Sequence, residues 1–225
     1  METLGNVIIT GSASGMGLAT AKLFVERGWT VFGIDVKGCP QEFLSSENYF
    51  HRVADVCDKD SLPVLSDANI LINSAGVQGT DKDIDVNLKG VINCCEKYAL
   101  GNMNIESVIN QASLSATLGT DFPQYVASKG GVISYTKWVA KEIAKYGATC
   151  NSLSFSGVLT EANRPVIESS ELWAQVMELT PLQKWTTVKE VAEWVYFMTT
   201  VNKSCSGQDI IIDNLESLNG VFVWA

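Results

Sequence analysis

The first thirty residues of the chain combine a short apolar run, a glycine-rich turn and a helical pattern. The apolar run, residues 6–10, is typical of a buried strand, and residues 18–28 carry the spacing of an amphipathic helix. Between them lies GSASGMG, residues 11–17. Glycines let a backbone approach a pyrophosphate closely, and a following helix N-terminus attracts its negative charge. This order is the layout of a dinucleotide-binding unit, although a glycine turn alone can be merely a tight turn.

The remaining sequence continues the alternation of strands and helices. Further strands are predicted at residues 30–34, 49–56, 69–73, 106–110, 149–155 and 208–213, and further helices at 83–100, 124–146, 161–180 and 188–200, with room for only a stunted helix in 57–68. Such alternation indicates a parallel sheet covered on both faces. We therefore predict a doubly wound α/β fold with three layers, formed by residues 1–225 as a single domain.

Composition limits the classes of partner. With 46% hydrophobic and 18% charged residues the chain is typical of a globular protein, and a net charge of −9 argues against nucleic acid or an anionic membrane as a partner. A strand begins almost at Met1, which leaves no room for a signal sequence, and no apolar run has the length of a membrane span. The six cysteines lack metal-site spacing, and His51 is the only histidine, in a strand pattern that suggests an edge position. We expect a cytoplasmic protein with reduced thiols and no metal site.

One pair of side chains carries a possible acid–base chemistry. Tyr125 and Lys129 are four residues apart at the start of the helix predicted at 124–146, so they project from the same face. Lowering a tyrosine pKa by about three units needs roughly 4 kcal/mol, which an ammonium about 4 Å away supplies at an effective dielectric of about 20. The pair is a candidate proton donor and acceptor. The alternative is a packed aromatic ring beside a solvated amine.

An acidic residue follows the second predicted strand. Asp35 stands close to the position where a carboxylate hydrogen-bonds the adenine ribose of a dinucleotide. A carboxylate there repels the 2′-phosphate of NADP, Lys37 lies beyond the acid, and the glycine turn contains no Lys or Arg. The sequence therefore favours NAD over NADP. The alternative is a solvated aspartate at a strand end.

Several motifs in a fixed order make the chain resemble the short-chain dehydrogenase/reductase family. They are TGSASGMG at 10–17, Asp35, Asp55-Val56, NSAG at 73–76, Asn87, Ser113, YVASK at 125–129 and SGQDIIIDN near the end, and together they span residues 6–213. The resemblance implies a Rossmann fold.

The resemblance also implies a catalytic set and a cofactor site. The catalytic set would be Asn87, Ser113, Tyr125 and Lys129: the tyrosine exchanges the hydroxyl proton, the serine binds the substrate oxygen, the lysine tunes the tyrosine and holds the nicotinamide ribose, and the asparagine supports a water. Residues expected to line the cofactor are Gly11, Ser14, Gly15, Met16, Asp35, Asp55, Val56, Asn73, Ala75, Gly76, Tyr125, Lys129, Val158 and Thr160. Two departures stand out, because Ser156-Gly157 replaces a usual Pro-Gly and the connection from Gly76 to Asn87 is short.

Substrate specificity is expected within residues 157–185. Apolar side chains there that are candidates for a pocket wall are Leu159, Trp173, Met177, Leu182 and Trp185, and no basic cluster accompanies them. A small secondary alcohol or ketone, a polyol or a sugar fits this stretch better than an acyl-carrier substrate. Alternatives are a 3-oxoacyl-carrier reductase of the same family and a non-catalytic NAD-binding sensor or scaffold. Trp138 falls on the outer side of its predicted helix, which suggests a homodimer or homotetramer.

Overall fold

The computed structural model describes residues 3–65, 67–120 and 122–219. Seven parallel strands form the central sheet, in the order β3-β2-β1-β4-β5-β6-β9. Their bounds are β1 Asn6–Thr10, β2 Thr30–Asp35, β3 Tyr49–Val53, β4 Ile70–Asn73, β5 Ser107–Gln111, β6 Thr149–Phe155 and β9 Asp209–Ile212. The order reverses at β1, between β2 and β4, and a reversal of this kind opens a crevice beyond the carboxyl ends of the strands.

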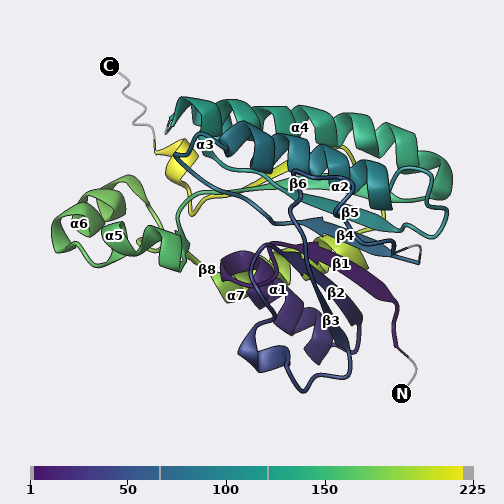
Figure 1. Ribbon diagram of the computed structural model, residues 1–225. Coiled ribbons are helices and arrows are strands. Elements are labelled where there is room, and N and C mark those ends of the chain that lie inside the picture. Colours follow the sequence, from purple (N-terminus) through teal and green to yellow (C-terminus); the bar gives the residue numbers. More distant parts are fainter. Residues whose placement is uncertain (1–2, 66, 121, 220–225) are drawn as a thin grey trace.

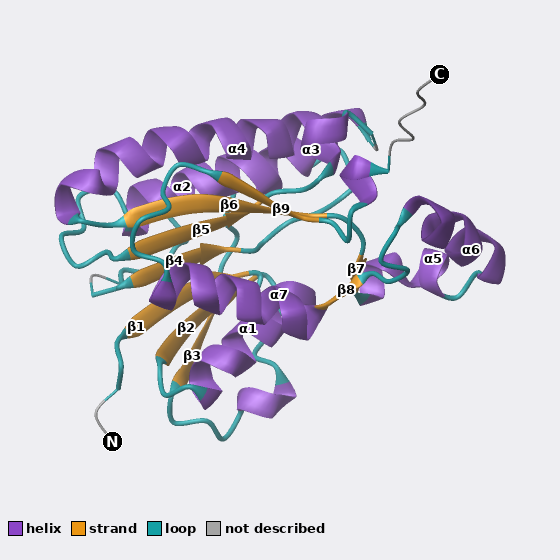
Figure 2. Cartoon of the chain, turned by 180° about the vertical axis from the view of Figure 1, so that it is seen from behind, coloured by secondary structure: helices purple, strands orange, loops and turns teal. Residues whose placement is uncertain are grey.

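Helices cover both faces of this sheet (Figures 1 and 2). On one face lie α1 (Gly15–Glu26) and α7 (Val188–Tyr196), and on the other α2 (Gly90–Tyr98) and α4 (Pro123–Ile143). Each helical layer has its own apolar core: Phe24 and Val195 belong to the first, and Val132 and Val139 to the second. The three-layer doubly wound fold predicted from the sequence is confirmed.

Short helical turns complete the layers. They are the 3-10 turns η1 Gln41–Phe43, η3 Ala144–Tyr146, η4 Glu161–Asn163 and η6 Glu216–Leu218, the π-helical turns η2 Asp85–Lys89 and η5 Phe197–Val201, and the single-turn helix α3 Ser115–Leu118. The two π turns adjoin α2 and α7, so each helix predicted there as one regular segment, 83–100 and 188–200, changes its hydrogen-bond pattern along its length. π turns occur often near functional sites.

The helix predicted at residues 161–180 is interrupted. After η4 the chain forms α5 (Arg164–Ile167) and then α6 (Ser170–Leu179). Ser169 separates them, because its hydroxyl accepts a hydrogen bond from Leu172 N at 3.3 Å and so begins a new helix. Neither short helix buries a residue, and both stand away from the main body. They are joined to it through β7 (Val158–Leu159) and β8 (Thr186–Thr187), which pair in parallel.

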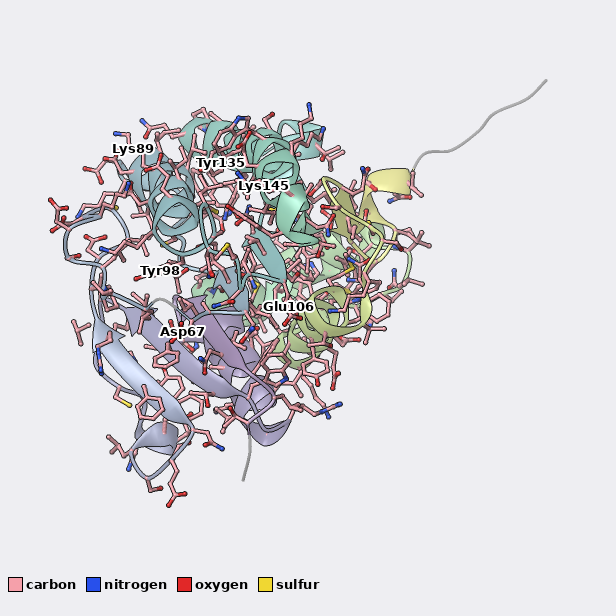
Figure 3. The ribbon with its side chains drawn as sticks, turned by 90° about the vertical axis from the view of Figure 1, so that its right-hand side faces the viewer. Asp67, Lys89, Tyr98, Glu106, Tyr135 and Lys145 are labelled. Atoms are coloured by element: carbon pink, nitrogen blue, oxygen red, sulfur yellow. The ribbon has the colours of Figure 1, made fainter. Side chains whose placement is uncertain are left out.

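The stunted helix expected in residues 57–68 is wrong for the part of that segment that the structure describes. Asp58 accepts hydrogen bonds from the backbone of Asp60 and Ser61, at 3.1 and 3.4 Å, which is turn chemistry that competes with a helix. Tyr98 of α2, labelled in Figure 3, donates to Pro63 O at 2.9 Å and fixes the connection against the helical layer. The third strand also ends earlier than predicted, at Val53 instead of residue 56.

Candidate active site

The glycine-rich turn is shaped by close backbone contacts. Gly11 has a φ of 68°, and a Cβ there would lie 2.7 Å from the backbone N of Ala75. A Cβ at Gly17 would overlap the carbonyl oxygen of Gly11, so only glycine lets α1 start this close to the turn. Around Gly15, in contrast, the space is open, and the nearest atom to a Cβ there is the methyl group of Thr160 at 3.8 Å. The turn is tight against the loop after β4 and open at the N-terminus of α1, where a pyrophosphate fits.

Asp35 ties the end of β2 to this turn. One carboxylate oxygen accepts from Ala13 N at 2.9 Å and the other accepts from Lys37 N, also at 2.9 Å. Each oxygen has a further lone pair, so the carboxylate keeps acceptor capacity for ribose hydroxyls. Of the neighbouring residues expected at the cofactor, Ser14 is exposed and Met16 packs partly against the core under α1. The residues present therefore fit an adenine dinucleotide.

A buried hydroxyl chain supports the same turn, and sequence reasoning missed it. Tyr49 donates to Ser12 Oγ at 3.0 Å and its hydroxyl lies 3.1 Å from His51 Nδ1, while His51 Nε2 lies 2.9 Å from Lys37 O. Burial raises the pKa of Tyr49 to about 12, so the phenol is neutral. A Cβ at Gly33 would overlap this hydroxyl. Glycine inside a strand signals such a close approach. His51 lies on the edge strand β3, as the pattern predicts.

The loop after β4 brings further expected residues to the turn. Thr10 Oγ1 accepts from the backbone N of both Ser74 and Ala75 at 3.1 Å. The Asn73 side chain points elsewhere: its amide donates to Asn110 Oδ1 on β5 at 2.8 Å, and both residues are buried. Only the backbone of Asn73 is therefore available to a bound cofactor.

Asp55 and Val56 follow β3 and differ in exposure. Asp55 is exposed and accepts from Cys57 N at 2.9 Å. Val56 is buried, and a Cβ at Gly90 would lie 2.6 Å from its methyl group. Gly90 therefore lets α2 begin directly against this segment.

Lys129 is a buried cation at the carboxyl edge of the sheet. It lies on α4, its ammonium donates to Gln111 O at 2.9 Å, and it lies 5.7 Å from the centre of the Tyr125 ring. Burial lowers the pKa of Lys129 to about 8, and the negative charge of Asp83 opposes that shift. At neutral pH the amine is charged, next to the phenol. The spacing of the two residues along α4 brings them together as the sequence predicts.

Asn87 lies in η2 and holds the loop after β4 in place by hydrogen bonds. Its Oδ1 accepts from Val77 N at 2.8 Å, and its Nδ2 donates to Val77 O at 2.8 Å and to Ser128 Oγ at 3.1 Å. Both amide hydrogens are thus used within the protein. The residue joins η2, the loop and α4 into one unit behind Lys129.

Ser113 follows β5 at the start of the turn that leads into α3. Its hydroxyl is nearly buried, donates to Ser115 Oγ at 3.1 Å and accepts from Ser115 N at 3.2 Å. α3 packs against α4, which places the Ser113 segment beside the N-terminal turn that carries Tyr125. One acceptor lone pair and the rotation of the hydroxyl remain for a substrate oxygen.

The segment after β6 passes close to the glycine-rich turn. Thr160 lies over Gly15, as described above, and Val158 is buried in β7. A Cβ at Gly157 would overlap the Trp185 indole, which is buried and meets the Trp173 ring edge-on at 5.3 Å. The Trp185 side chain therefore packs between the start of β7 and α6, next to β8. Leu159 and Leu182, also expected to line a pocket, are exposed.

A model of the family described as enoyl-(acyl carrier protein) reductase matches residues 11–214. The family model and the fold together define an oxidoreductase of the Rossmann type that uses a nicotinamide cofactor. The chain belongs to the short-chain dehydrogenase/reductase family.

Among its relatives is a D-threitol dehydrogenase of Mycolicibacterium smegmatis, 29% identical over 92% of this chain and 90% of the relative. An NAD-dependent glycerol dehydrogenase of Listeria innocua is also 29% identical, over 92% of this chain and 91% of the relative.

Solved structures share the fold. A 3-oxoacyl-[acyl-carrier protein] reductase of Brucella melitensis with bound NAD superposes with a TM-score of 0.81 at 25% identity, covering 95% of this chain and 91% of that chain. An Agrobacterium tumefaciens structure with bound NADP, described as a 2-deoxy-D-gluconate 3-dehydrogenase, has a TM-score of 0.87 at 24% identity. The superposition covers 96% of this chain and 98% of that chain.

Two absences hold for the described ranges. Within residues 3–65, 67–120 and 122–219 no group of three or more His, Cys, Asp or Glu side chains is arranged to hold a metal ion. In the same ranges no helix has the length and apolar character to cross a membrane.

Proposed function

We propose that the chain interconverts a secondary alcohol and a ketone with NAD, and that Tyr125 is the general acid and base. The observation that carries this proposal is the buried ammonium of Lys129 beside Tyr125, at the strand edge that also holds the glycine-rich turn. A buried charge is costly, so its placement next to a phenol points to a tuned proton donor.

Each side chain of the set has a chemical task in this proposal. A bound nicotinamide would supply the hydride acceptor for the alcohol carbon or the hydride donor for the ketone carbon. Tyr125 takes the hydroxyl proton during oxidation and returns it during reduction, and Ser113 hydrogen-bonds the substrate oxygen, where negative charge develops. Lys129 stabilises the phenolate and holds the nicotinamide ribose. Asn87 keeps the loop at Val77 in place and supports a water that extends the proton path.

We propose NAD in preference to NADP. Asp35 presents a carboxylate where the adenine ribose would lie, and its position is fixed by two backbone hydrogen bonds. The remaining residues proposed for the cofactor are Gly11, Ser14, Gly15, Met16, Asp55, Val56, Asn73, Ala75, Gly76, Val158 and Thr160. Substituting Asp35→Ser should raise affinity for NADPH relative to NADH, because the carboxylate repels the 2′-phosphate.

For the substrate we propose a small secondary alcohol, a polyol or a sugar. The threitol and glycerol dehydrogenases among the relatives support this class. The Brucella melitensis reductase supports the alternative, a 3-oxoacyl-carrier substrate. Residues 157–185 are the proposed specificity segment within a single domain.

The deciding experiment is turnover of an alcohol and ketone panel that includes polyols, sugars and a 3-oxoacyl thioester. Tyr125→Phe should lose more than about 10²-fold in kcat, the scale of general acid–base catalysis, while binding NADH as tightly as the parent. NADH binding with no turnover of any panel member would instead favour the non-catalytic NAD-binding sensor.

We also propose a homodimer or homotetramer in the cytoplasm. Trp138 is 47% exposed on α4, and all six cysteines are free, as in a reducing compartment.

A further inference from the structure

Asp83 is a fully buried carboxylate that no motif of the sequence singles out. It stands at the end of the short loop between β4 and η2. One oxygen accepts from Gly79 N at 3.0 Å, and the other accepts from both the N and the Oγ1 of Thr80 at 3.0 Å. Three donated hydrogen bonds hold the loop in one conformation.

The loop that Asp83 holds lies against Lys129 and against two residues near the acid–base pair, Asn87 and Phe122. At Gly76 a Cβ would lie 3.7 Å from the ammonium of Lys129. The next residue, Val77, is hydrogen-bonded to the Asn87 side chain through both its N–H and its carbonyl. At Gly79 a Cβ would lie 3.0 Å from the ring of Phe122, the residue that precedes α4 and its first-turn Tyr125. Glycine at both positions lets the loop pass this closely.

Asp83 also supplies the opposite charge for a buried cation. On its own helix the Lys129 ammonium lies 5.7 Å from the centre of the Tyr125 ring, and the buried carboxylate of Asp83 is the negative charge that acts against the lowering of its pKa. β5 contributes the neutral carbonyl of Gln111, and η2 contributes the neutral amide of Asn87. Buried charges persist in proteins when they are paired.

We propose that Asp83 is a positioning residue for the Tyr125–Lys129 pair: it fixes the loop at residues 76–80 against Lys129 and supplies a buried negative charge as the internal counter-charge of that amine. The inference rests on the proposed function. Without Asp83 the pKa of Lys129, already lowered to about 8 by burial, falls further. The phenol then loses its cationic neighbour at neutral pH and becomes a weaker acid.

The test compares Asp83→Asn, which removes the charge but keeps an acceptor oxygen, with Thr80→Val, which removes one hydrogen bond to Asp83 and no charge. For alcohol oxidation, kcat/KM rises with pH as the base form of Tyr125 accumulates. In Asp83→Asn the midpoint of this rise should move up by about one pH unit, with a loss of about tenfold near neutral pH. Thr80→Val should keep the parental midpoint. An unmoved midpoint in Asp83→Asn, with an equal loss at every pH, overturns the proposal and leaves a structural role.

A second readout needs no turnover. Phenolate absorbs in the near ultraviolet, so the absorbance of the parent minus that of Tyr125→Phe reports the ionisation of Tyr125. The absorbance of Asp83→Asn minus that of the double variant Asp83→Asn/Tyr125→Phe should show the same ionisation at higher pH. If no alcohol in the panel is oxidised and this shift is still found, the proposed function fails and the inference stands. If oxidation is found and the phenolate difference is the same in both backgrounds, the inference fails alone.

If Asp83→Asn does not fold, the parent protein provides the test. An internal counter-charge is shielded from solvent ions, so the phenolate midpoint should change by less than about 0.2 pH unit between low and high salt. A change of about half a unit or more means that dissolved ions balance Lys129, which contradicts the proposal.

Discussion

At the scale of single residues, the buried ammonium of Lys129 sets a conflict between stability and chemistry. The pKa of Lys129 is lowered to about 8 by burial, below the ordinary value of 10.5, so the folded state binds this proton more weakly than the unfolded state. Between these two pH values the unfolded chain holds more protons, and the free energy of unfolding rises with pH. Below pH 8 the full cost of burying the charge is present, roughly 3 kcal/mol.

The first prediction follows from that cost. Lys129→Met should increase the free energy of unfolding near pH 7 by about 2 kcal/mol, since the lost hydrogen bond to Gln111 O returns about 1 kcal/mol of the gain. The gain should shrink as the pH approaches 10.5, and activity should be lost. Urea unfolding across this pH range measures both trends. Lys137→Met, at an exposed position on α4, is the control and should stay within about 0.5 kcal/mol at every pH.

The second prediction concerns the hydroxyl of Tyr49. Tyr49→Phe breaks the chain from Ser12 to His51 and should destabilise the fold by about 1–2 kcal/mol and weaken NADH binding several-fold. The matched control is Tyr135→Phe on α4 (Figure 3), whose buried hydroxyl has no hydrogen-bond partner within the described ranges. That variant should be neutral or slightly stabilising. Equal effects of the two substitutions in thermal unfolding and NADH titration would contradict a role for the chain.

Local spacing predicts some of these residues and not others. Tyr125 and Lys129 are neighbours because they lie one turn apart on the same helix. Asp35 reaches the glycine-rich turn because Asp35 ends β2, the turn follows β1, and these two strands are adjacent and parallel. Tyr49 and Ser12 meet across 37 residues of sequence, and the loop that Asp83 holds lies against Phe122, the residue before α4. Contacts of this kind are set by packing, which no short motif encodes.

At the scale of elements, the β7–β8 pair joins the projecting α5–α6 unit to the body of the protein. Trp185 fills the space that a side chain at Gly157 would need, and Trp173 of α6 rests against it. Hydrophobic periodicity predicts helix within residues 161–180. The break at Ser169 comes from a single capping hydroxyl, which does not alter the hydrophobic pattern and so is not detected by it. The inner strands β1, β5 and β6 were predictable to within a few residues because both their faces are buried.

The third prediction tests this junction. Gly157→Ala should displace Trp185 and destabilise the protein by about 1–3 kcal/mol, the usual cost of overpacking. Because α6 belongs to the proposed specificity segment, KM for the substrate should rise more than Kd for NADH. Gly38→Ala, where a Cβ meets nothing within 4 Å, is the control and should leave both constants unchanged. A parental KM in Gly157→Ala would show that the α5–α6 unit plays no part in substrate binding.

At the scale of the whole molecule, two exposed aromatic surfaces lie on opposite faces of the sheet. One is Trp138 on α4, stacked on Tyr135 with ring centres 5.5 Å apart. The other is the pair Trp194 and Phe197, beside a hollow of about 510 Å³ on α7 and η5. Exposed aromatic side chains in clusters mark protein–protein contact sites. The sequence drew attention to the first surface only, since the helical wheel of 188–200 does not reveal which residues the sheet leaves uncovered.

The last prediction uses these two surfaces to distinguish a dimer from a tetramer. If each surface meets its own copy, the parent is a tetramer, Trp138→Arg and Trp194→Arg each give dimers, and the double variant is a monomer. If only the α4 surface is an interface, the parent is a dimer and Trp138→Arg alone gives monomers. Light scattering at micromolar concentration separates these outcomes. Met103→Arg, at an exposed apolar side chain outside both surfaces, should keep the parental mass. A parent that already has the mass of one chain rejects both forms of assembly and leaves the two aromatic surfaces without a self-partner.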